Sequence, residues 1–376
     1  MEVAISGYGS VSAAGYGSAA GLAAAANRRT TWRVDAATGL PIYPVVNLPV
    51  VTDVDALADR HALDRAAVLA LHAARRAVDQ AGWRGQEFAI LVGCSRGPTA
   101  SWESSFGEFA GRGRVGLRTS PQTTLGSIGF ALARLFGTTG LTDSMSVTCS
   151  SGLHALLHGV ALLRAGLAER VLVGGTEAAL TPFTLRQMEA LRVYAQGTPD
   201  GAPPCRPLAD AASGMAIGEG AAFLALEAAS VSASKLRLDG VGFAQEHGES
   251  LTGMSADGVG LRTAMAGSLA GTETPDFVVA HAPGTRLGNA AELAALSRVF
   301  PRRRPPVTSF KWSTGHTFGA SGPLAVCAAL RMLEEQRWVG LPYRPGPPPN
   351  RLTSALVNAT GFGGNSVSVV VRRAAG

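Results

Sequence analysis

The sequence predicts an α/β fold in which a largely buried sheet is covered on both faces by helices. Short apolar runs typical of strands alternate with longer helical runs along the whole chain. Strands bounded on both sides by helices imply a sheet buried between layers. The chain has 376 residues, of which 46% are hydrophobic, so it is long enough to bury a large core.

The first series of elements extends to about residue 230. The runs predicted as strands are EVAIS (2–6), FAILVG (88–93), MSVTC (145–149), RVLVGG (170–175) and AAFLALE (221–227). Two helices are predicted between them, over 64–82 and over 150–168, because their apolar residues recur with helical spacing.

A second series begins after the small polar stretch ASVSASK (229–235). Its predicted strands are KLRLDGVGFA (235–244), DFVVAH (276–281), PPVTSFK (305–311) and SVSVVVRR (366–373), with helices over 289–300 and 322–336. Two series of similar size predict two similar halves, residues 1–230 and 235–376.

Composition excludes several classes of function. The net charge of +6 comes almost wholly from arginine, since the chain has two lysines, Lys235 and Lys311. The basic residues are dispersed, so we expect no nucleic-acid partner. No apolar run reaches the ~20 residues that cross a membrane, and no signal peptide opens the sequence. Four widely spaced cysteines argue against disulfides and a structural zinc site, so we expect a cytoplasmic protein without a metal.

Cys149 lies where a predicted strand meets a predicted helix, in VTCSSGLHAL. Free N–H groups and the positive end of the helix dipole favour a thiolate at such a position. A strand-to-helix turn also supplies backbone donors for an oxyanion. The alternative is a small buried core cysteine, as we expect for Cys94 and Cys327, and this segment alone leaves both interpretations open.

Two later segments favour the nucleophile. His281 ends a predicted strand, and His316 lies in a Gly/Ser/Thr loop before a helix. Both positions deliver a side chain to the carboxyl edge of the sheet, the usual place for active sites in α/β proteins. Lys311, in a chain that otherwise uses arginine, indicates a need for a compact ammonium group. Glu292, eleven residues after His281, is the expected counter-ion.

These segments resemble motifs of the β-ketoacyl-ACP synthases, the decarboxylating condensing enzymes of the thiolase superfamily. The similar stretches are VTCSSGLHAL, CRPLADAASGMAIGEGAAFLALE, HAPGTRLGNAAE, KWSTGHTFGASG and NATGFGGNS, which together extend over most of the chain. The resemblance implies a thiolase fold, with two pseudo-duplicated βαβαβαββ halves that form a five-layered αβαβα structure.

The resemblance also implies catalytic roles. Cys149 would accept an acyl chain as a thioester from an acyl carrier protein. His281 and His316 would bind the thioester carbonyl of malonyl-ACP and stabilise the enolate left by decarboxylation. Lys311, paired with Glu292, would organise the loops around the histidines.

Further residues are expected around the substrate. Phe362 would act as a gate, and its N–H would form an oxyanion hole with that of Cys149. Thr285 and Thr317 would hold the phosphopantetheine arm, and Met215 stands where the family has a phenylalanine that lines the extender site. No cofactor is implied beyond the phosphopantetheine carried by the acyl carrier protein.

Some residues depart from the family pattern. Ala282 and Pro283 replace a Gly-Thr pair, which removes a hydroxyl and a backbone N–H. Asn289 replaces an aspartate at an expected helix N-cap, where asparagine caps about as well. With Met215, these changes favour a specialised synthase of a polyketide, polyene or fatty-acid pathway.

Two alternatives remain at this point. One is a non-catalytic partner subunit like the chain-length factors, which usually lack the cysteine retained here as Cys149. The other is a thiolase, which the GHT sequence of the second histidine loop disfavours. Either as synthase or as partner, we expect a homodimer or a heterodimer with a chain-length-factor-like homologue.

Overall fold

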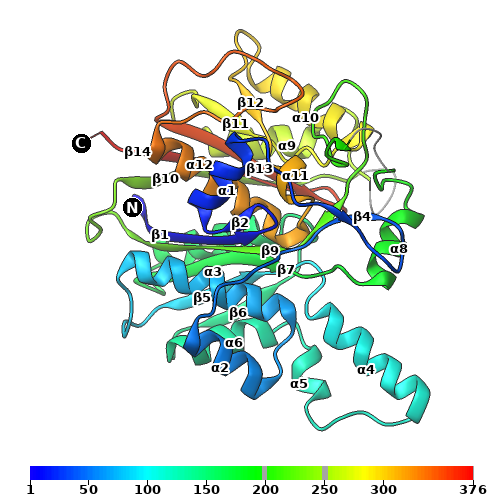
Figure 1. The fold of residues 1–376 in the computed structure, drawn as a ribbon. Helices are drawn as coiled ribbons and strands as arrows, with labels where there is room; N and C mark the ends of the chain where they lie inside the picture. The colour runs from blue at the N-terminus through cyan, green and yellow to red at the C-terminus, as the bar shows by residue number, and fades with distance from the viewer. Residues whose placement is uncertain (197–200, 248–252, 376) are drawn as a thin grey trace.

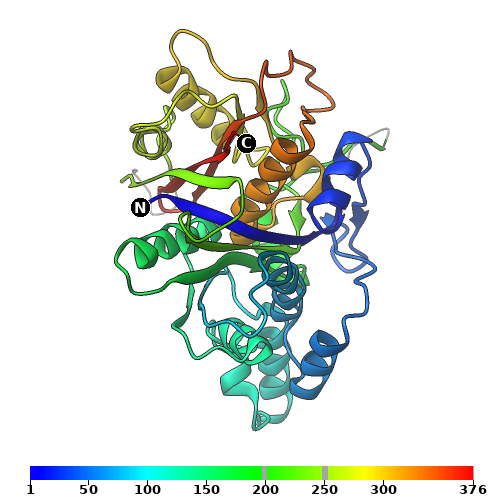
Figure 2. The same ribbon diagram turned by 90° about the vertical axis from the view of Figure 1, so that its left-hand side faces the viewer.

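The structure is a computed structural model that describes residues 1–196, 201–247 and 253–375. Within these residues, no helix is long and apolar enough to cross a membrane. The fold is built on one large twisted sheet, which Figures 1 and 2 show from two directions.

The strands of both halves join in that sheet. Among the described residues it has eleven strands, in the order β12-β11-β13-β14-β10-β1-β9-β7-β5-β6, with β2 paired to β1. The N-terminal half contributes β1 (Val3–Ser12), β2 (Gly15–Tyr16), β5 (Ala89–Gly93), β6 (Thr142–Met145), β7 (Arg170–Glu177) and β9 (Gly220–Ala228). The C-terminal half contributes β10 (Leu236–Gln245), β11 (Phe277–Val279), β12 (Val307–Thr308), β13 (Ser354–Gly361) and β14 (Asn365–Arg373).

The two halves have the same topology. Outward from the joint, β1-β9-β7-β5-β6 corresponds strand for strand to β10-β14-β13-β11-β12. In each half the outer three strands are parallel and the inner ones antiparallel. The joint is short, because β1 and β10 pair only through Val3↔Leu238 and Ala4↔Arg237. The strand order confirms the predicted pseudo-duplication.

The two halves of the sheet form two layers, and helices form the other three. On the N-terminal side, α3 (Arg65–Ala81) packs on β1, β9 and β7 and against α6 (Ser127–Phe136). On the C-terminal side, α9 (Val259–Ser268) packs on β10 and β14, with α10 (Arg286–Val299) beside it. Between the two halves of the sheet lie α7 (Ser151–Arg164) and α12 (Ser321–Glu335), which contact strands of both halves and each other. The five-layered arrangement is the expected one.

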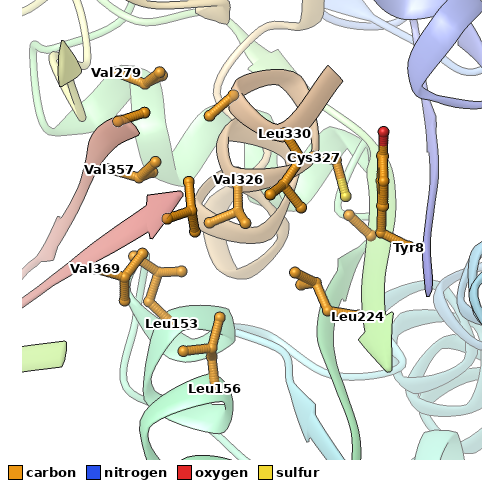
Figure 3. Close-up of a cluster of buried hydrophobic side chains, with 14 of the residues drawn as sticks. Tyr8, Leu153, Leu156, Leu224, Val279, Val326, Cys327, Leu330, Val357 and Val369 are labelled. Atoms are coloured by element: carbon orange, nitrogen blue, oxygen red, sulfur yellow. The ribbon is translucent and has the colours of Figure 1, made fainter. Parts of the chain in front are cut away.

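The largest hydrophobic core lies in the central layer. Figure 3 shows Val326 and Leu330 of α12 between Val357 of β13 and Leu224 of β9, with Leu153 of α7 below. All five side chains are buried. Burying a side chain of this size contributes roughly 1.5–3 kcal/mol to the free energy of unfolding. The central layer therefore holds α7 and α12 in place. Both helices begin beside the site described below.

The remaining elements surround this framework. They are α1 (Ser18–Ala26), α2 (Thr52–His61), α4 (Thr99–Arg112), α5 (Thr119–Thr123), α8 (Pro182–Ala190), α11 (Lys311–Thr314), the 3₁₀ turn η2 (Phe318–Ala320), and a small sheet of β3 (Arg33–Val34), β4 (Pro41–Tyr43) and β8 (Ile217–Gly218). Helix α4 extends away from the body of the molecule with α5 beside it (Figure 1).

Several predicted element boundaries differ from the structure, and three of these differences bear on the site. The strand expected over 305–311 is limited to Val307–Thr308, and Lys311 instead begins α11. The strand expected over 145–149 ends at Met145, because the chain turns before Cys149 and keeps only an isolated bridge there. The helix expected over 289–300 begins earlier, at Arg286, because Thr285 is its N-cap and accepts the N–H of Gly288 at 3.3 Å. Asn289 is therefore inside α10 rather than at its cap.

Candidate active site

Cys149 lies on a tight turn that leads into α7. Thr148 immediately before it has φ 49°, a left-handed conformation that is rare for a β-branched residue. The helix begins two residues later, at Ser151. Such strained turns are concentrated at functional sites, where the surrounding structure holds them.

The loop after β13 is packed against this turn. The hydroxyl of Thr148 donates to the carbonyl of Phe362 at 3.3 Å. A Cβ added at Gly361 would lie 2.0 Å from Thr148 Oγ1 and 3.0 Å from Cys149 N, so only glycine allows the two segments to come this close. The contact places Phe362 directly beside Cys149.

His281 follows β11, and its backbone is held from two sides. Glu292 Oε1 accepts its N–H at 3.0 Å, and Oε2 of the same carboxylate accepts the N–H of Ala282 at 2.6 Å. Lys311 Nζ donates to the carbonyl of His281. Ala282 has φ 24°, so the loop is strained where the family pattern has glycine.

The expected pairing of Lys311 with Glu292 takes an indirect form. Among the described residues no ion pair joins them; both groups hold the backbone of His281 instead. Asn358 of β13 donates to Glu292 Oε1 at 2.9 Å. All three side chains are buried, so each depends on these contacts for its hydrogen bonds.

His316 is held by the start of α12. Its Nδ1 lies 3.0 Å from Ser321 Oγ, which also accepts the N–H of Thr317 at 3.0 Å. The hydroxyls of Thr317 and Ser321 are 3.0 Å apart as well. One serine therefore fixes the orientation of the imidazole ring and of the peptide that follows it.

The two histidines meet although 35 residues separate them in the sequence. Their ring centroids are 5.3 Å apart and the planes are nearly perpendicular, at 83°. Both rings line a cavity of about 560 Å³ together with Cys149. We call it the histidine-side cavity; its wall also includes Arg192, Met215, Pro283, Thr285, Arg286, Phe318 and Phe362.

A second cavity, of about 550 Å³, adjoins the first. Cys149, Phe318 and Phe362 line both. We call it the arginine-side cavity; its other walls are Ser95, Arg96, Thr99, Trp102, Glu103, Thr148, Phe183, Thr184, Gln187 and Met188. Cys149 therefore stands at the junction of two cavities, and the histidines line only one of them.

Comparison with known proteins identifies the family to which this chain belongs. Models of the β-ketoacyl synthase N-terminal and C-terminal domains match residues 52–232 and 237–341. The ketoacyl synthase alpha subunit of the tetracenomycin polyketide synthase from Streptomyces glaucescens is 30% identical over 299 residues, which cover 72% of this chain and 69% of that protein. The chain belongs to the β-ketoacyl synthase family.

Solved structures of ketosynthases share the fold. The complex AntDE:AntF, a type II PKS acyl-carrier protein with its ketosynthase bound to the hexaketide, matches with a TM-score of 0.86 at 21% identity and covers 100% of this chain and 99% of that one. The ketosynthase ApeO in complex with its chain length factor ApeC, from Xenorhabdus doucetiae, matches with a TM-score of 0.84 at 22% identity, covering 99% and 98%.

In this member of the family, the surroundings of Cys149 oppose the thiolate that the start of a helix favours. Burial, and then the nearby Glu177, raise the pKa of Cys149 to about 12, although the charges of Lys311 and Arg96 act in the opposite direction. The helix dipole favours the thiolate only modestly and loses to desolvation. The surroundings of the sulfur therefore favour the protonated thiol.

Burial lowers the pKa values of all three basic side chains of the site. Burial, followed by the charge of Lys311, lowers the pKa values of His281 and His316 well below 6.5, so both rings are neutral near pH 7. Burial also lowers the pKa of Lys311 to about 8. Nδ1 of His281 is buried without a hydrogen-bond partner, so this ring is fixed through its backbone and its packing.

The other residues expected around the substrate divide into two groups. Thr285, Met215 and Phe362 line the histidine-side cavity. Thr317 does not; it is buried beneath His316 and its hydroxyl faces Ser321. The hydroxyl oxygen of Thr285 is already engaged as the cap of α10.

Sequence reasoning missed Glu177, the last residue of β7. Its buried carboxylate accepts the N–H groups of Ser95 at 2.9 Å, Arg96 at 3.1 Å and Gly319 at 3.1 Å. Burial raises its pKa to about 7. It therefore joins the loop after β5 to the η2 turn beside His316. An acidic residue that ends the otherwise apolar strand VLVGGTE is the one local signal that could have marked it.

Proposed function

We propose that this chain is a catalytic β-ketoacyl-ACP synthase. It transfers an acyl chain from acyl carrier protein to Cys149 and condenses it with malonyl-ACP by decarboxylation. The observation that carries the proposal is that Cys149, His281 and His316 line one cavity. A decarboxylative Claisen condensation needs a nucleophile for the acyl group and donors for an enolate within reach of each other.

In the first step, Cys149 Sγ attacks the thioester carbonyl of acyl-ACP. The new S–C bond forms, the bond from the carbonyl carbon to the pantetheine sulfur breaks, and the thiol proton passes to the departing sulfur. Because the resting thiol is protonated, a neutral histidine of the same cavity is the base that carries this proton. Covalent attachment divides one difficult reaction into two easier ones.

In the second step, malonyl-ACP loses CO2 and leaves an enolate of acetyl-ACP. The neutral imidazoles of His281 and His316 donate to the enolate oxygen, and the positive charge of Lys311 stabilises it from behind. Loss of one preorganised donor typically costs about 3–4 kcal/mol of barrier. The enolate carbon attacks the acyl carbonyl on Cys149, so that a C–C bond forms and the S–C bond to Cys149 breaks. The released thiolate takes a proton from water.

Two arginines suit a phosphopantetheine-bearing carrier. Arg192 and Arg286 line the histidine-side cavity, and both are exposed. Guanidinium groups bind phosphate with paired hydrogen bonds, so these residues are placed to hold the phosphate of the carrier while its arm enters. Thr285 and Phe362 then border the path toward Cys149.

The surface around α4 supports a second subunit. Trp102, Phe106 and Phe109 lie on this projecting helix, with exposed fractions of 57%, 60% and 52%. Among the described strands, β6 lies at the edge of the main sheet, where the backbone groups of its outer side can pair with a further strand. Trp102 also lines the arginine-side cavity, so a partner here would close that cavity. We propose a homodimer or a heterodimer with a related chain.

The test is a condensation assay with acyl-ACP and malonyl-ACP, with and without a candidate partner chain. The proposal predicts a β-ketoacyl-ACP two carbons longer than the primer, and no product from Cys149→Ala. If wild type and Cys149→Ala support the same product formation beside a partner, this chain is instead a non-catalytic partner subunit.

A further inference from the structure

The arginine-side cavity is the place for the acyl chain if the proposed function holds. An acyl group on Cys149 Sγ must extend into one of the two cavities that the sulfur borders. The histidine-side cavity has to admit the pantetheine arm and the malonyl group during condensation. The arginine-side cavity is then the one available to the acyl chain.

The walls of this cavity combine apolar side chains with polar ones. Besides aromatic residues, they include the polar side chains of Ser95, Arg96, Thr99, Glu103, Thr148, Thr184 and Gln187. Aliphatic chains gain free energy by leaving water for apolar walls, and they lose part of that gain where polar groups must be desolvated without a partner.

Arg96 is the cationic group in this wall, and it is held in a fixed place. Its guanidinium lies over the ring of Phe318, 5.6 Å from the centroid, and Nη1 donates to Gln187 Oε1 at 2.7 Å. Its backbone N–H is bound by Glu177 at 3.1 Å. Phe318 also packs beside His316, with ring centroids 5.3 Å apart. The cation therefore stands next to the reacting centre.

The charge of Arg96 is not neutralised by a direct partner. In the described part of the chain no carboxylate forms an ion pair with it, although 14 pairs between arginine and a carboxylate are present there. Its charge also lowers the pKa of Cys149, which places it within electrostatic reach of the sulfur. A half-buried guanidinium with unused donors offers hydrogen bonds to an oxygen atom of a ligand.

We infer that Arg96 is a specificity-determining residue that selects acyl chains carrying a hydrogen-bond-accepting oxygen, keto or carboxylate, on the carbons that follow the thioester. This rests on the proposed function. A site built to hydrogen-bond an oxygen discriminates strongly against the analogue that lacks it, because its donors are then left unpaired.

Glu103 refines the expected order of substrates. It lines the same cavity, and its Oε1 accepts the hydroxyl of Thr181 at 2.6 Å. A carboxylate on the chain is attracted by Arg96 and repelled by Glu103, whereas a neutral keto oxygen experiences the attraction with little repulsion. We expect the keto chain to be preferred over the carboxylate chain.

The experiment compares three four-carbon donors on the intact protein. Butyryl-, 3-oxobutyryl- and succinyl-ACP are supplied separately without malonyl-ACP, and the rate of thioester formation on Cys149 is followed by intact mass. Each rate is measured for wild type, Arg96→Met and Arg186→Met. Met matches the length of the arginine stem without its charge, and Arg186 is an exposed control on α8 that does not line the cavity.

The acylation rates of Arg96→Met measure how reactive each donor is when the guanidinium is absent. We expect the 3-oxobutyryl-to-butyryl rate ratio to be about tenfold or more higher in wild type than in Arg96→Met, and unchanged in Arg186→Met. A circular dichroism spectrum and a melting temperature of Arg96→Met that match those of wild type show that the variant is folded. Gln187→Met, which frees the guanidinium without removing it, should lower the ratio partially.

The outcomes separate the two claims. An Arg96-dependent preference for either oxygenated donor over butyryl supports the inference, and the rank of succinyl against 3-oxobutyryl tells which oxygen is selected. Equal ratios in wild type and Arg96→Met overturn the inference while the proposed function stands. If no donor acylates Cys149 in any protein, the proposed function fails and the inference fails with it.

Discussion

Glu292 accepts the backbone N–H of His281 at 3.0 Å, so a buried carboxylate holds the first histidine loop by its main chain. The same carboxylate accepts the N–H of Ala282 at 2.6 Å. Glu292 is thus a positioning residue: it does not line the histidine-side cavity, and it acts through His281. The strained φ of Ala282 depends on these bonds.

Replacing Glu292 by glutamine should destabilise the protein and misplace His281. The amide nitrogen cannot accept a hydrogen bond, so one backbone N–H loses its buried partner, at a cost of about 1–3 kcal/mol. Urea unfolding measures this change, and Glu335→Gln is the control because Glu335 forms a partly exposed ion pair with Arg331. Equal stability of both variants would show that the carboxylate is not needed to hold the loop.

Ser321 should matter for decarboxylation and not for acylation. His316→Ala should still form the Cys149 thioester but lose malonyl decarboxylation, because the enolate loses a donor. Ser321→Ala frees the imidazole held at 3.0 Å and should lower kcat for decarboxylation about tenfold to a hundredfold with little change in KM. Ser297→Ala, an exposed serine on α10, serves as control. A wild-type kcat in Ser321→Ala would remove the positioning role.

Decarboxylation should slow as the pH rises through about 8, because Lys311 then loses the charge that stabilises the enolate. Its pKa lies below the ordinary value of 10.5, so between these values the unfolded chain binds more protons than the folded one. The contribution of Lys311 to stability therefore rises with pH over the range in which activity falls, which separates this effect from unfolding. A pH profile of kcat measures it, and Lys311→Met should lack this limb. An identical limb in that variant would assign the titration to another group.

Glu177→Gln should make the Cys149 thiol more reactive. The carboxylate raises the pKa of Cys149, so its removal lowers that pKa and increases the thiolate fraction. We expect alkylation by iodoacetamide at pH 8 to be about threefold to tenfold faster, followed at Cys149 by peptide mass spectrometry. Glu169→Gln, an exposed carboxylate, should leave the rate unchanged. Slower alkylation in Glu177→Gln would show that the carboxylate does not oppose the thiolate.

Local patterns predicted the elements that have clear boundaries and an apolar face. The helix expected over 64–82 is α3, which begins after the cap Asp64 and is closed by the C-cap Gly82, with φ 70°. Helix α4 was not predicted, because its aromatic residues Trp102 and Phe106 face solvent and do not form a core stripe. Aromatic residues that face solvent add nothing to the apolar periodicity of a core-facing helix, so that periodicity does not reveal α4.

The same distinction applies to the site. Compact sequence motifs contain four of the candidate site residues, namely Cys149, His281, His316 and Lys311. Their residue types and local spacing were therefore enough to identify them as candidates. Glu177 acts through N–H groups of segments far from it in the sequence, and local spacing contains no trace of such contacts. The resting protonation of Cys149 also depended on burial, which the helix position alone did not reveal.

The most direct test is the intact mass of the protein after incubation with acyl-ACP alone. The account predicts an increase equal to the acyl group, located on Cys149 by peptide mapping, cleaved by hydroxylamine and absent from Cys149→Ala. Retention of the unmodified mass, or an adduct that persists in Cys149→Ala, would contradict it.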